Sequence, residues 1–320
     1  MDKTKLLVLA NSSQPELVLL DGLPVLAAVG NEFAAIEQPA AEAEVILCWP
    51  GPCRLLEQVW PMARSVRWVH CVYAGLDGFL FPALIESNVP VTNSRGVFSD
   101  SLGEFVIAAV LFFAKDLRRM IRSQASEVWD PFDVEEISGQ TVGILGYGSI
   151  GRAVALRARA MGMRVTALRR NPESAPSDPF VDEVLPPRRK LELVAGCDYL
   201  VVTAPLTPET VGMVGADEFE AMKPGAVVIN VGRGAVIDEA ALIRALLEQK
   251  IRGAALDVFN TEPLPKGHPF YRMENVLLSP HCADHTPRWL WKAMEYFAYN
   301  LARYRRGEPL QNVVDKKRGY

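Results

Sequence analysis

A glycine-rich turn constrains the fold of this chain more than any other feature. The turn, GYGSIG at 146–151, directly follows the apolar and β-branched segment TVGIL at 141–145. Apolar residues then recur at helical spacing as far as Met161, Gly162 follows at the expected helix end, and a second apolar segment starts at Val165. Strand, glycine turn, helix and strand in this order form the context in which GxGxxG indicates a dinucleotide-binding unit.

Each glycine of the turn has its own expected role. Gly146 would permit the tight turn, Gly148 would let the backbone approach a pyrophosphate, and Gly151 would let the helix pack closely on the strand. The amide groups and the dipole at the helix start would receive the phosphate charge. An ordinary glycine-rich loop is the alternative, and the flanking strands and helix favour dinucleotide binding.

The end of the second strand predicts which dinucleotide is bound. An acidic residue about twenty positions after the turn would bind the ribose 2′-hydroxyl of NAD. Arg169 and Arg170 stand there instead, and the donors of a guanidinium suit a 2′-phosphate. The sequence therefore predicts a preference for NADP(H), with NAD(H) still possible, whereas two solvated surface arginines are the alternative.

The length of the chain and its alternating pattern predict two α/β domains. The 320 residues are 49% hydrophobic and 22% charged, which suits a globular protein too long for one ordinary core. Besides those flanking the glycine turn, strands are expected at 5–10, 45–48, 67–72, 90–93, 198–203, 225–230, 253–256 and 275–278. Helices are expected at 52–62, 100–125, 237–249 and 289–306.

This order predicts two doubly wound parallel-sheet domains. The first, flavodoxin-like, is expected to comprise residues 1–99 and to be completed by a C-terminal helix within 289–320. The second, at 100–288, is expected to be the Rossmann domain that binds the dinucleotide.

Charge and cysteine content argue against several classes of function. A net charge of −4 does not indicate a basic surface that would bind nucleic acid, and the basic cluster 188–190 is expected to be a solvated loop. The longest apolar segment, 105–114, is too short to span a membrane, and the N-terminus does not resemble a signal peptide. No metal site is predicted from the cysteines, whose scatter suits reduced thiols in the cytoplasm: Cys48, Cys53, Cys71, Cys197 and Cys282.

Three polar side chains follow predicted strands in the second half of the chain. Arg233 lies between two glycines, and Glu262 and His281 follow the next two strands. Ligands bind outside the carboxyl ends of strands in such sheets, so Arg233 could hold a carboxylate through paired hydrogen bonds. A carboxylate beside an imidazole favours its protonated form, which suits a general acid. A surface salt bridge and a structural histidine are the alternatives.

The motifs of the chain resemble those of the D-isomer-specific 2-hydroxyacid dehydrogenases, in particular glyoxylate/hydroxypyruvate reductases. The resemblance implies an NAD(P)-dependent oxidoreductase that transfers a hydride to or from a small 2-oxo or D-2-hydroxy acid. The matching segments are GILGYGSIGR (143–152), APLTPET (204–210), INVGRGAVIDEAAL (229–242), ALDVFNTEPLP (255–265) and LLSPHCADHT (277–286).

The resemblance also implies roles for individual residues. Arg233 would clamp the substrate carboxylate, His281 would be the acid/base, and Glu262 would be its partner. Backbone amides of Ala74 and Gly75 would bind the substrate from the other domain, in a cleft between the two. The further residues implied to contact the cofactor are Asp257, on the carboxamide, and Ser149, Ile150, Thr203, Pro205, Thr210, Val231 and Gly232. A homodimer joined through the nucleotide domain is implied as well, with no nucleic-acid or membrane partner.

Three positions depart from the family pattern. Arg169 replaces the acidic ribose ligand, Thr203 stands where many members have histidine, and Asp284 adds a carboxylate after His281. A dinucleotide-sensing corepressor on the same fold is the alternative function, and the complete set of arginine, glutamate and histidine favours the enzyme. The sequence leaves the identity of the 2-oxo acid open.

Overall fold

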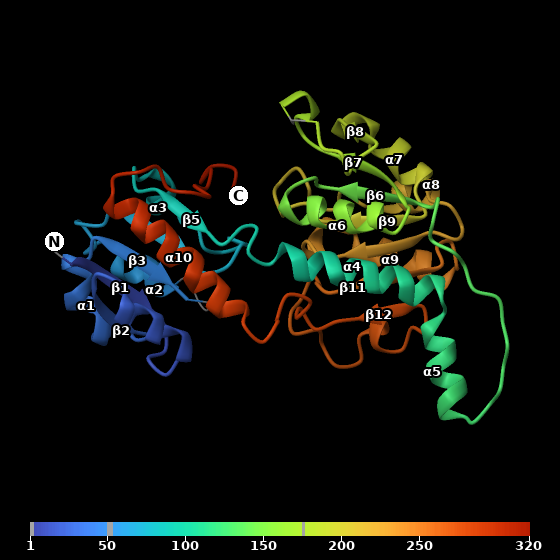
Figure 1. Ribbon diagram of the computed structural model, residues 1–320, viewed down its shortest axis with the longest axis horizontal. Helices are drawn as coiled ribbons and strands as arrows, with labels where there is room; N and C mark the ends of the chain where they lie inside the picture. Colours follow the sequence, from blue (N-terminus) through green and yellow to red (C-terminus); the bar gives the residue numbers. More distant parts are fainter. Residues whose placement is uncertain (1–2, 50–53, 175–176) are drawn as a thin grey trace. The chain divides into compact units, whose positions relative to one another are not determined.

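The computed structural model describes residues 3–49, 54–174 and 177–320. The chain forms two compact units, Met1–Phe98 with Pro287–Tyr320 (unit 1) and Ser99–Thr286 (unit 2) (Figure 1). Cys53 and the first residues of the helix expected at 52–62 lie outside the described residues.

Unit 1 is built on a five-stranded parallel sheet. The strand order, β2-β1-β3-β4-β5, is that of flavodoxin-like sheets. The strands are β1 (Thr4–Leu9), β2 (Val25–Gly30), β3 (Val45–Cys48), β4 (Trp68–Cys71) and β5 (Val91–Asn93).

Helices cover both faces of this sheet because successive strand residues point to opposite sides. Leu7 and Leu9 of β1 pack with α1, α2 and α3, whereas Leu6 and Val8 pack with α10 and the 3₁₀ turn η1. The helices are η1 (Pro15–Gly22), α1 (Phe33–Glu42), α2 (Arg54–Val59), α3 (Pro82–Glu86) and α10 (Trp289–Arg305).

Unit 2 is built on a seven-stranded parallel sheet. Its order, β12-β11-β10-β9-β6-β7-β8, is the Rossmann order extended by one strand. The strands are β6 (Thr141–Leu145), β7 (Arg164–Leu168), β8 (Glu183–Leu185), β9 (Tyr199–Val202), β10 (Val227–Asn230), β11 (Gly253–Leu256) and β12 (Val276–Leu278). The prediction of two parallel α/β sheets is confirmed.

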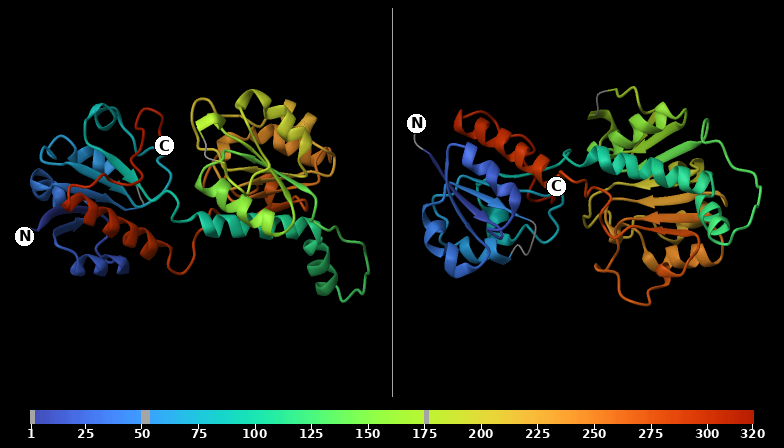
Figure 2. Two further views of the ribbon diagram at one scale, coloured as in Figure 1. Left: turned by 45° about the horizontal axis from the view of Figure 1, so that its top comes forward. Right: turned by 60° about the horizontal axis from the view of Figure 1, so that its bottom comes forward.

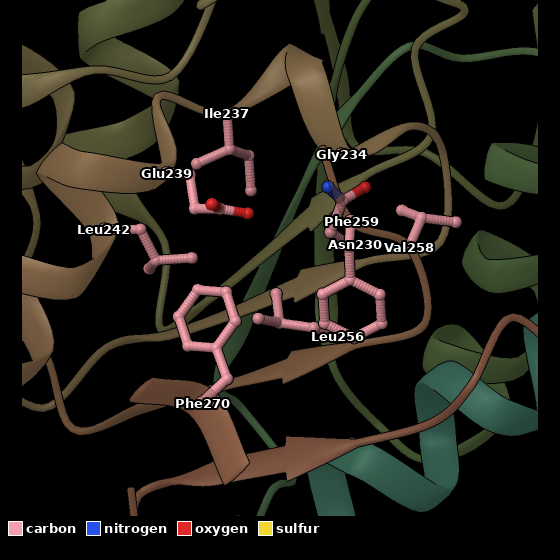
Figure 3. Close-up of a pocket in the computed structure, with 9 residues that line it drawn as sticks. All are labelled: Asn230, Gly234, Ile237, Glu239, Leu242, Leu256, Val258, Phe259 and Phe270. Atoms are coloured by element: carbon pink, nitrogen blue, oxygen red, sulfur yellow. The ribbon is translucent and has the colours of Figure 1, made fainter. Parts of the chain in front are cut away.

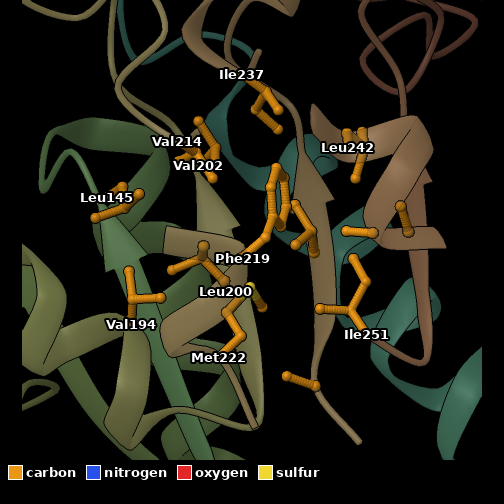
Figure 4. Close-up of a cluster of buried hydrophobic side chains, with 14 of the residues drawn as sticks. Leu145, Val194, Leu200, Val202, Val214, Phe219, Met222, Ile237, Leu242 and Ile251 are labelled. Atoms are coloured by element: carbon orange, nitrogen blue, oxygen red, sulfur yellow. The ribbon is translucent and has the colours of Figure 1, made fainter. Parts of the chain in front are cut away.

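The helices of unit 2 form a layer on each face of its sheet (Figure 2). α4 and α6 pack on one face, and α7, α8 and α9 pack on the other, around the apolar cluster drawn in Figure 4. The helices are α4 (Ser99–Ala114), α5 (Leu117–Ala125), α6 (Ser149–Ala160), α7 (Lys190–Gly196), α8 (Ala216–Ala221) and α9 (Glu239–Leu247). The 3₁₀ turns are η2 (Pro172–Ser174), η3 (Pro187–Arg189), η4 (Gly234–Val236) and η5 (Pro269–Tyr271).

Two local predictions are wrong. The helix expected at 100–125 is broken at Asp116, which has a left-handed φ of 44° and whose side chain accepts a hydrogen bond from the Arg119 amide at the start of α5. The basic cluster is not simply a solvated loop, because Lys190 begins α7 and its Nζ lies 2.8 Å from the largely buried carboxylate of Glu218. Asp116 caps the helix locally, whereas the partner of Lys190 lies in a different helix, α8.

Among the described residues, no helix combines the length and the apolar character needed to cross a membrane.

Candidate active site

The glycine turn follows β6 and is locked in place by its neighbours. Gly146 has a φ of +101°, and a Cβ there would lie 2.6 Å from backbone atoms of Ala204. The amides of Gly146 and Tyr147 donate to the carbonyl of Leu168 at the end of β7, at 3.2 and 3.1 Å. Only glycine satisfies both the left-handed conformation and the close approach.

The start of α6 fits a phosphate group. Gly148 is the N-cap residue, and no side chain of the described residues caps this helix. A Cβ added at Gly148 would meet nothing within 4 Å, whereas one at Gly151 would lie 2.8 Å from the carbonyl oxygen of Gly146. The amides of the first turn, including those of Ser149 and Ile150, are thus open to an anion at the positive end of the helix dipole.

The predicted cofactor residues after β9 shape the same region. Thr203 Oγ1 donates to the carbonyl of Gly146 at 2.5 Å. Thr210 Oγ1 donates to the carbonyl of Pro205 at 2.6 Å and accepts from the Thr207 amide at 2.8 Å, which closes the loop 205–210. These hydroxyls hold protein backbone, and their contacts with a cofactor stay predictions.

Arg169 and Arg170 follow β7 and are both half-buried. The amide of Arg169 donates to the carbonyl of Leu185 at 3.0 Å. The guanidinium of Arg170 pairs with Glu209 on the loop 205–210. Sequence reasoning missed this carboxylate, because nothing in the glutamate's own motif indicated that the loop faces the end of β7.

Arg233 lies just after β10 in a tightly built loop. Its Nη1 donates to the carbonyl of Gly232 at 2.7 Å, and the Gly232 amide donates to Asn230 Oδ1 at 3.0 Å. The amide of Val231, the preceding residue, donates to the carbonyl of Val202 on β9.

The loop of Arg233 also packs directly on the segment that follows β11. A Cβ added at Gly234 would lie 2.1 Å from the carbonyl carbon of Phe259, so no larger residue fits. Beside it lies a cavity of about 10 Å³, enough for about one water (Figure 3). Its lining residues are Asn230, Gly234, Ile237, Glu239, Leu242, Leu256, Val258, Phe259 and Phe270.

Glu262 and His281 form a contact between the segments after β11 and β12. His281 Nδ1 lies 2.6 Å from Glu262 Oε2, and Glu262 Oε1 accepts from the Phe259 amide at 2.8 Å. An ionised carboxylate only accepts, so Nδ1 carries the hydrogen. Glu262 therefore contacts only Nδ1 and does not contact the other ring nitrogen, Nε2. The His281 side chain is 45% exposed.

Asp257 anchors the segment that carries His281. It is 1% exposed, and its Oδ1 accepts from Ser279 Oγ at 2.6 Å and from the amides of Cys282 and Ala283 at 3.0 and 3.1 Å. The family resemblance implied a cofactor contact for Asp257, which stays a prediction, and gave no sign of this anchoring. Nearby, burial raises the pKa of the Asp284 carboxyl, and the charge of Asp257 adds to that effect.

Ala74 and Gly75 belong to unit 1, whereas the other predicted site residues belong to unit 2. They lie on the loop after β4, where Asn93 Nδ2 donates to the carbonyl of Ala74 at 2.6 Å and the Ser94 amide donates to the carbonyl of Tyr73 at 3.0 Å. The loops after β4 and β5 are therefore joined. The substrate contacts predicted for Ala74 and Gly75 stay predictions.

Strand order explains how unit 2 assembles its site. β10, β11 and β12 are neighbours, so the segments with Arg233, Glu262 and His281 leave the same edge of the sheet side by side. The glycine turn and Thr203 leave that edge from β6 and β9, where the strand order reverses and where dinucleotides bind in such sheets. Among the described residues, no cluster of three or more His, Cys, Asp or Glu could hold a metal ion.

Comparison with known proteins gives the family. Residues 107–283 match the model of the D-isomer specific 2-hydroxyacid dehydrogenase, NAD binding domain. The chain is 33% identical over 267 residues to a glyoxylate reductase of Korarchaeum cryptofilum, covering 81% of this chain and 79% of that protein. It is 31% identical to a D-3-phosphoglycerate dehydrogenase of Archaeoglobus fulgidus, where the match covers 87% of this chain and only 52% of the other. The chain belongs to the D-isomer-specific 2-hydroxyacid dehydrogenases, which are oxidoreductases that bind a nicotinamide dinucleotide.

Solved structures agree with this assignment. An NADPH-dependent glyoxylate/hydroxypyruvate reductase from Sinorhizobium meliloti, in complex with NADP and sulfate, superposes with a TM-score of 0.87 at 26% identity, covering 99% of this chain and 100% of the other. A D-isomer specific 2-hydroxyacid dehydrogenase from Xanthobacter autotrophicus, in complex with NADPH and MES, gives a TM-score of 0.82 at 30% identity with full coverage of both chains.

Proposed function

We propose that this protein reduces a small 2-oxo acid to the D-2-hydroxy acid with NADPH as the preferred cofactor, and that His281 is the acid/base. The observation that carries the proposal is the contact of 2.6 Å between His281 Nδ1 and Glu262. It orients the imidazole and leaves Nε2 to donate a proton to the carbonyl oxygen of the substrate. The carboxylate of Glu262 stabilises the charged imidazolium that this proton transfer requires.

Arg233 is proposed to bind the substrate carboxylate. Its guanidinium can make two parallel charge-assisted hydrogen bonds to a carboxylate. Its loop packs on Phe259 through Gly234, and the Phe259 amide holds Glu262. A change in either loop is therefore transmitted to the other, which fits a site that must orient one small substrate with both groups.

The start of α6 is proposed to hold the cofactor pyrophosphate, with Gly146, Gly148 and Gly151 shaping the turn. The bound cofactor would supply the hydride. Preference for NADP(H) is supported by the half-buried position of Arg169 and Arg170 at the end of β7, since guanidinium donors suit a 2′-phosphate.

The substrates named for the relatives, glyoxylate and hydroxypyruvate, are the first candidates for this chain. The test is the consumption of NADPH or NADH with glyoxylate, hydroxypyruvate or phenylpyruvate. In His281→Ala, turnover should fall by about two to four orders of magnitude while NADP⁺ still binds. Near-normal turnover in the folded variant would refute the role of His281, and a wild type that binds NADP⁺ without turning over any 2-oxo acid would favour a sensor.

A homodimer joined through unit 2 is part of the proposal. α5 has no buried residue, and it and the loop after it expose large apolar side chains. These are Met120, Ile121, Val128, Trp129 and Val134, with Trp129 95% exposed. Sedimentation of Trp129→Glu against wild type tests this face, since a buried charge should dissociate the dimer. A cytoplasmic location stays a prediction, with the free thiols of Cys197 and Cys282 in its support.

A further inference from the structure

The segment that carries His281 is held from two sides. From the end of β11, Asp257 Oδ1 accepts three hydrogen bonds from it, at 2.6 to 3.1 Å. From the first turn of α4, Ser101 Oγ donates to the carbonyl of Ala283 at 2.7 Å. Asp257 is buried and Ser101 is half-buried, so neither set of bonds is fully open to competing water.

The backbone of His281 needs such support. His281 has a φ of 52°, in the left-handed region that residues other than glycine adopt only when their surroundings impose it. The contact of its Nδ1 with Glu262 depends on this conformation, because a rotation of the backbone would swing the ring away. Asp257 fixes the start of the segment at Ser279 and its amides at 282–283.

Ser101 supplies the contact that Asp257 cannot make. Asp257 accepts hydrogen bonds from the N–H groups of the segment, whereas the hydroxyl of Ser101 donates to a carbonyl oxygen on it. Ser101 lies near the point where unit 2 begins at Ser99, and Ala283 lies just before unit 2 ends at Thr286. The bond therefore joins the segments by which the chain enters and leaves this unit.

We propose that Ser101 is a positioning residue for His281, acting through the carbonyl of Ala283. The proposal rests on the proposed function, because the orientation of His281 affects turnover only if His281 is the acid/base. Ser101 does not touch the reacting atoms in this scheme. Its hydroxyl keeps the 281–283 backbone in the conformation in which Nδ1 faces Glu262 and Nε2 is left for the substrate.

The test compares Ser101→Ala with Ser101→Thr, which keeps the hydroxyl. Ser99→Ala is the matched control, since Ser99 lies in the same turn and its buried Oγ has no hydrogen-bond partner among the described residues. In Ser101→Ala, kcat should fall about three- to tenfold, the effect of one lost hydrogen bond, while the Kd for NADP⁺ stays unchanged. Ser101→Thr should recover most of the activity, and Ser99→Ala should keep it.

A second readout uses the protein without cofactor or substrate. The ¹⁵N shifts of the His281 imidazole, assigned with His281→Gln, report which ring nitrogen carries the hydrogen in the neutral form. Wild type should be mainly the Nδ1–H form, and Ser101→Ala should raise the share of the Nε2–H form by about three- to tenfold. This result is expected whether or not a 2-oxo acid is turned over, so it separates the positioning role from the proposed reaction.

Three results would overturn the positioning role. The first is a tautomer ratio in Ser101→Ala within twofold of wild type. The second is a loss in Ser99→Ala equal to that in Ser101→Ala, which would indicate a general disturbance of α4. The third is Ser101→Thr behaving like Ser101→Ala, which would show that the hydroxyl is not the group that acts.

Discussion

Acidification from about pH 7.5 to about pH 5 should destabilise unit 1 by about 2 kcal/mol through His70 alone. His70 lies on β4, is completely buried, and packs against the ring of Phe297 on α10 at 5.5 Å. Its Nδ1 lies 2.7 Å from Thr92 Oγ1, which also accepts from Trp68 Nε1 at 2.8 Å. The Thr92 hydroxyl thus bonds both side chains, and the buried Nε2 of His70 has no hydrogen-bond partner among the described residues.

The magnitude follows from the two pKa values. Burial lowers the pKa of His70 to about 3 in the folded protein, against about 6.5 in an unfolded chain. Because the folded value is the lower one, the contribution to stability is complete above about pH 6.5 and is lost as the pH falls toward 3. A pH of about 5 lies about 1.5 units below the pKa of the unfolded state and is still above the pKa of the folded state. At about 1.4 kcal/mol per pH unit, the free energy of unfolding therefore falls by about 2 kcal/mol.

Urea unfolding followed by tryptophan fluorescence is the assay. Trp129 lies in unit 2 and the other tryptophans of the chain lie in unit 1, so the signal reports mainly on unit 1. His70→Asn keeps a side-chain amide that can bond Thr92, and this amide cannot be protonated. Between about pH 7.5 and about pH 5, the variant should therefore lose about 2 kcal/mol less of its free energy of unfolding than wild type does. Equal pH dependence in the two proteins would show that His70 does not control acid unfolding.

Three further predictions concern unit 2. Arg233→Ala should raise KM and lower kcat together, and unchanged kinetics of the folded fraction would make Arg233 structural. Arg169→Asp should shift kcat/KM toward NADH by at least about tenfold, and a wild type that already prefers NADH would show that this arginine faces solvent. Gly234→Ala should cost about 1–3 kcal/mol of stability and reduce kcat, because its Cβ would overlap the Phe259 backbone; a variant as stable and as active as wild type would show that the two loops are not rigidly packed.

The strands that the sequence predicted well are those buried on both faces. β3, β6 and β11 are buried along their whole length and are continuous apolar segments, which is the signal that a central parallel strand leaves. β2 and β8 were missed: both are edge strands with exposed positions, and β8 is only three residues long. The edge strands β5 and β12 were nevertheless predicted.

The break between α4 and α5 illustrates a second limit. Helical periodicity alone favoured one long helix, since residues on both sides of Asp116 fit a helical pattern. Asp116 ends that continuity by taking a left-handed conformation and capping α5. Aspartate is a common N-cap residue, so this signal was present in the sequence but could not be distinguished from an exposed acidic residue within a helix.

The polar groups at the site were predicted as types of side chain at strand ends, and the family resemblance implied the pairing of Glu262 with His281, but the hydrogen bonds that hold the two loops were not predicted. A strand-end position places Arg233, Glu262 and His281 on one edge of the sheet, whatever the details of the loops. Some of the contacts that hold these groups come from residues that were given no role in the prediction, such as Ser101 on α4. Sequence reasoning therefore locates the chemistry of this site, while the segment of His281 is also held by a hydrogen bond between residues about 180 positions apart, which only the fold brings together.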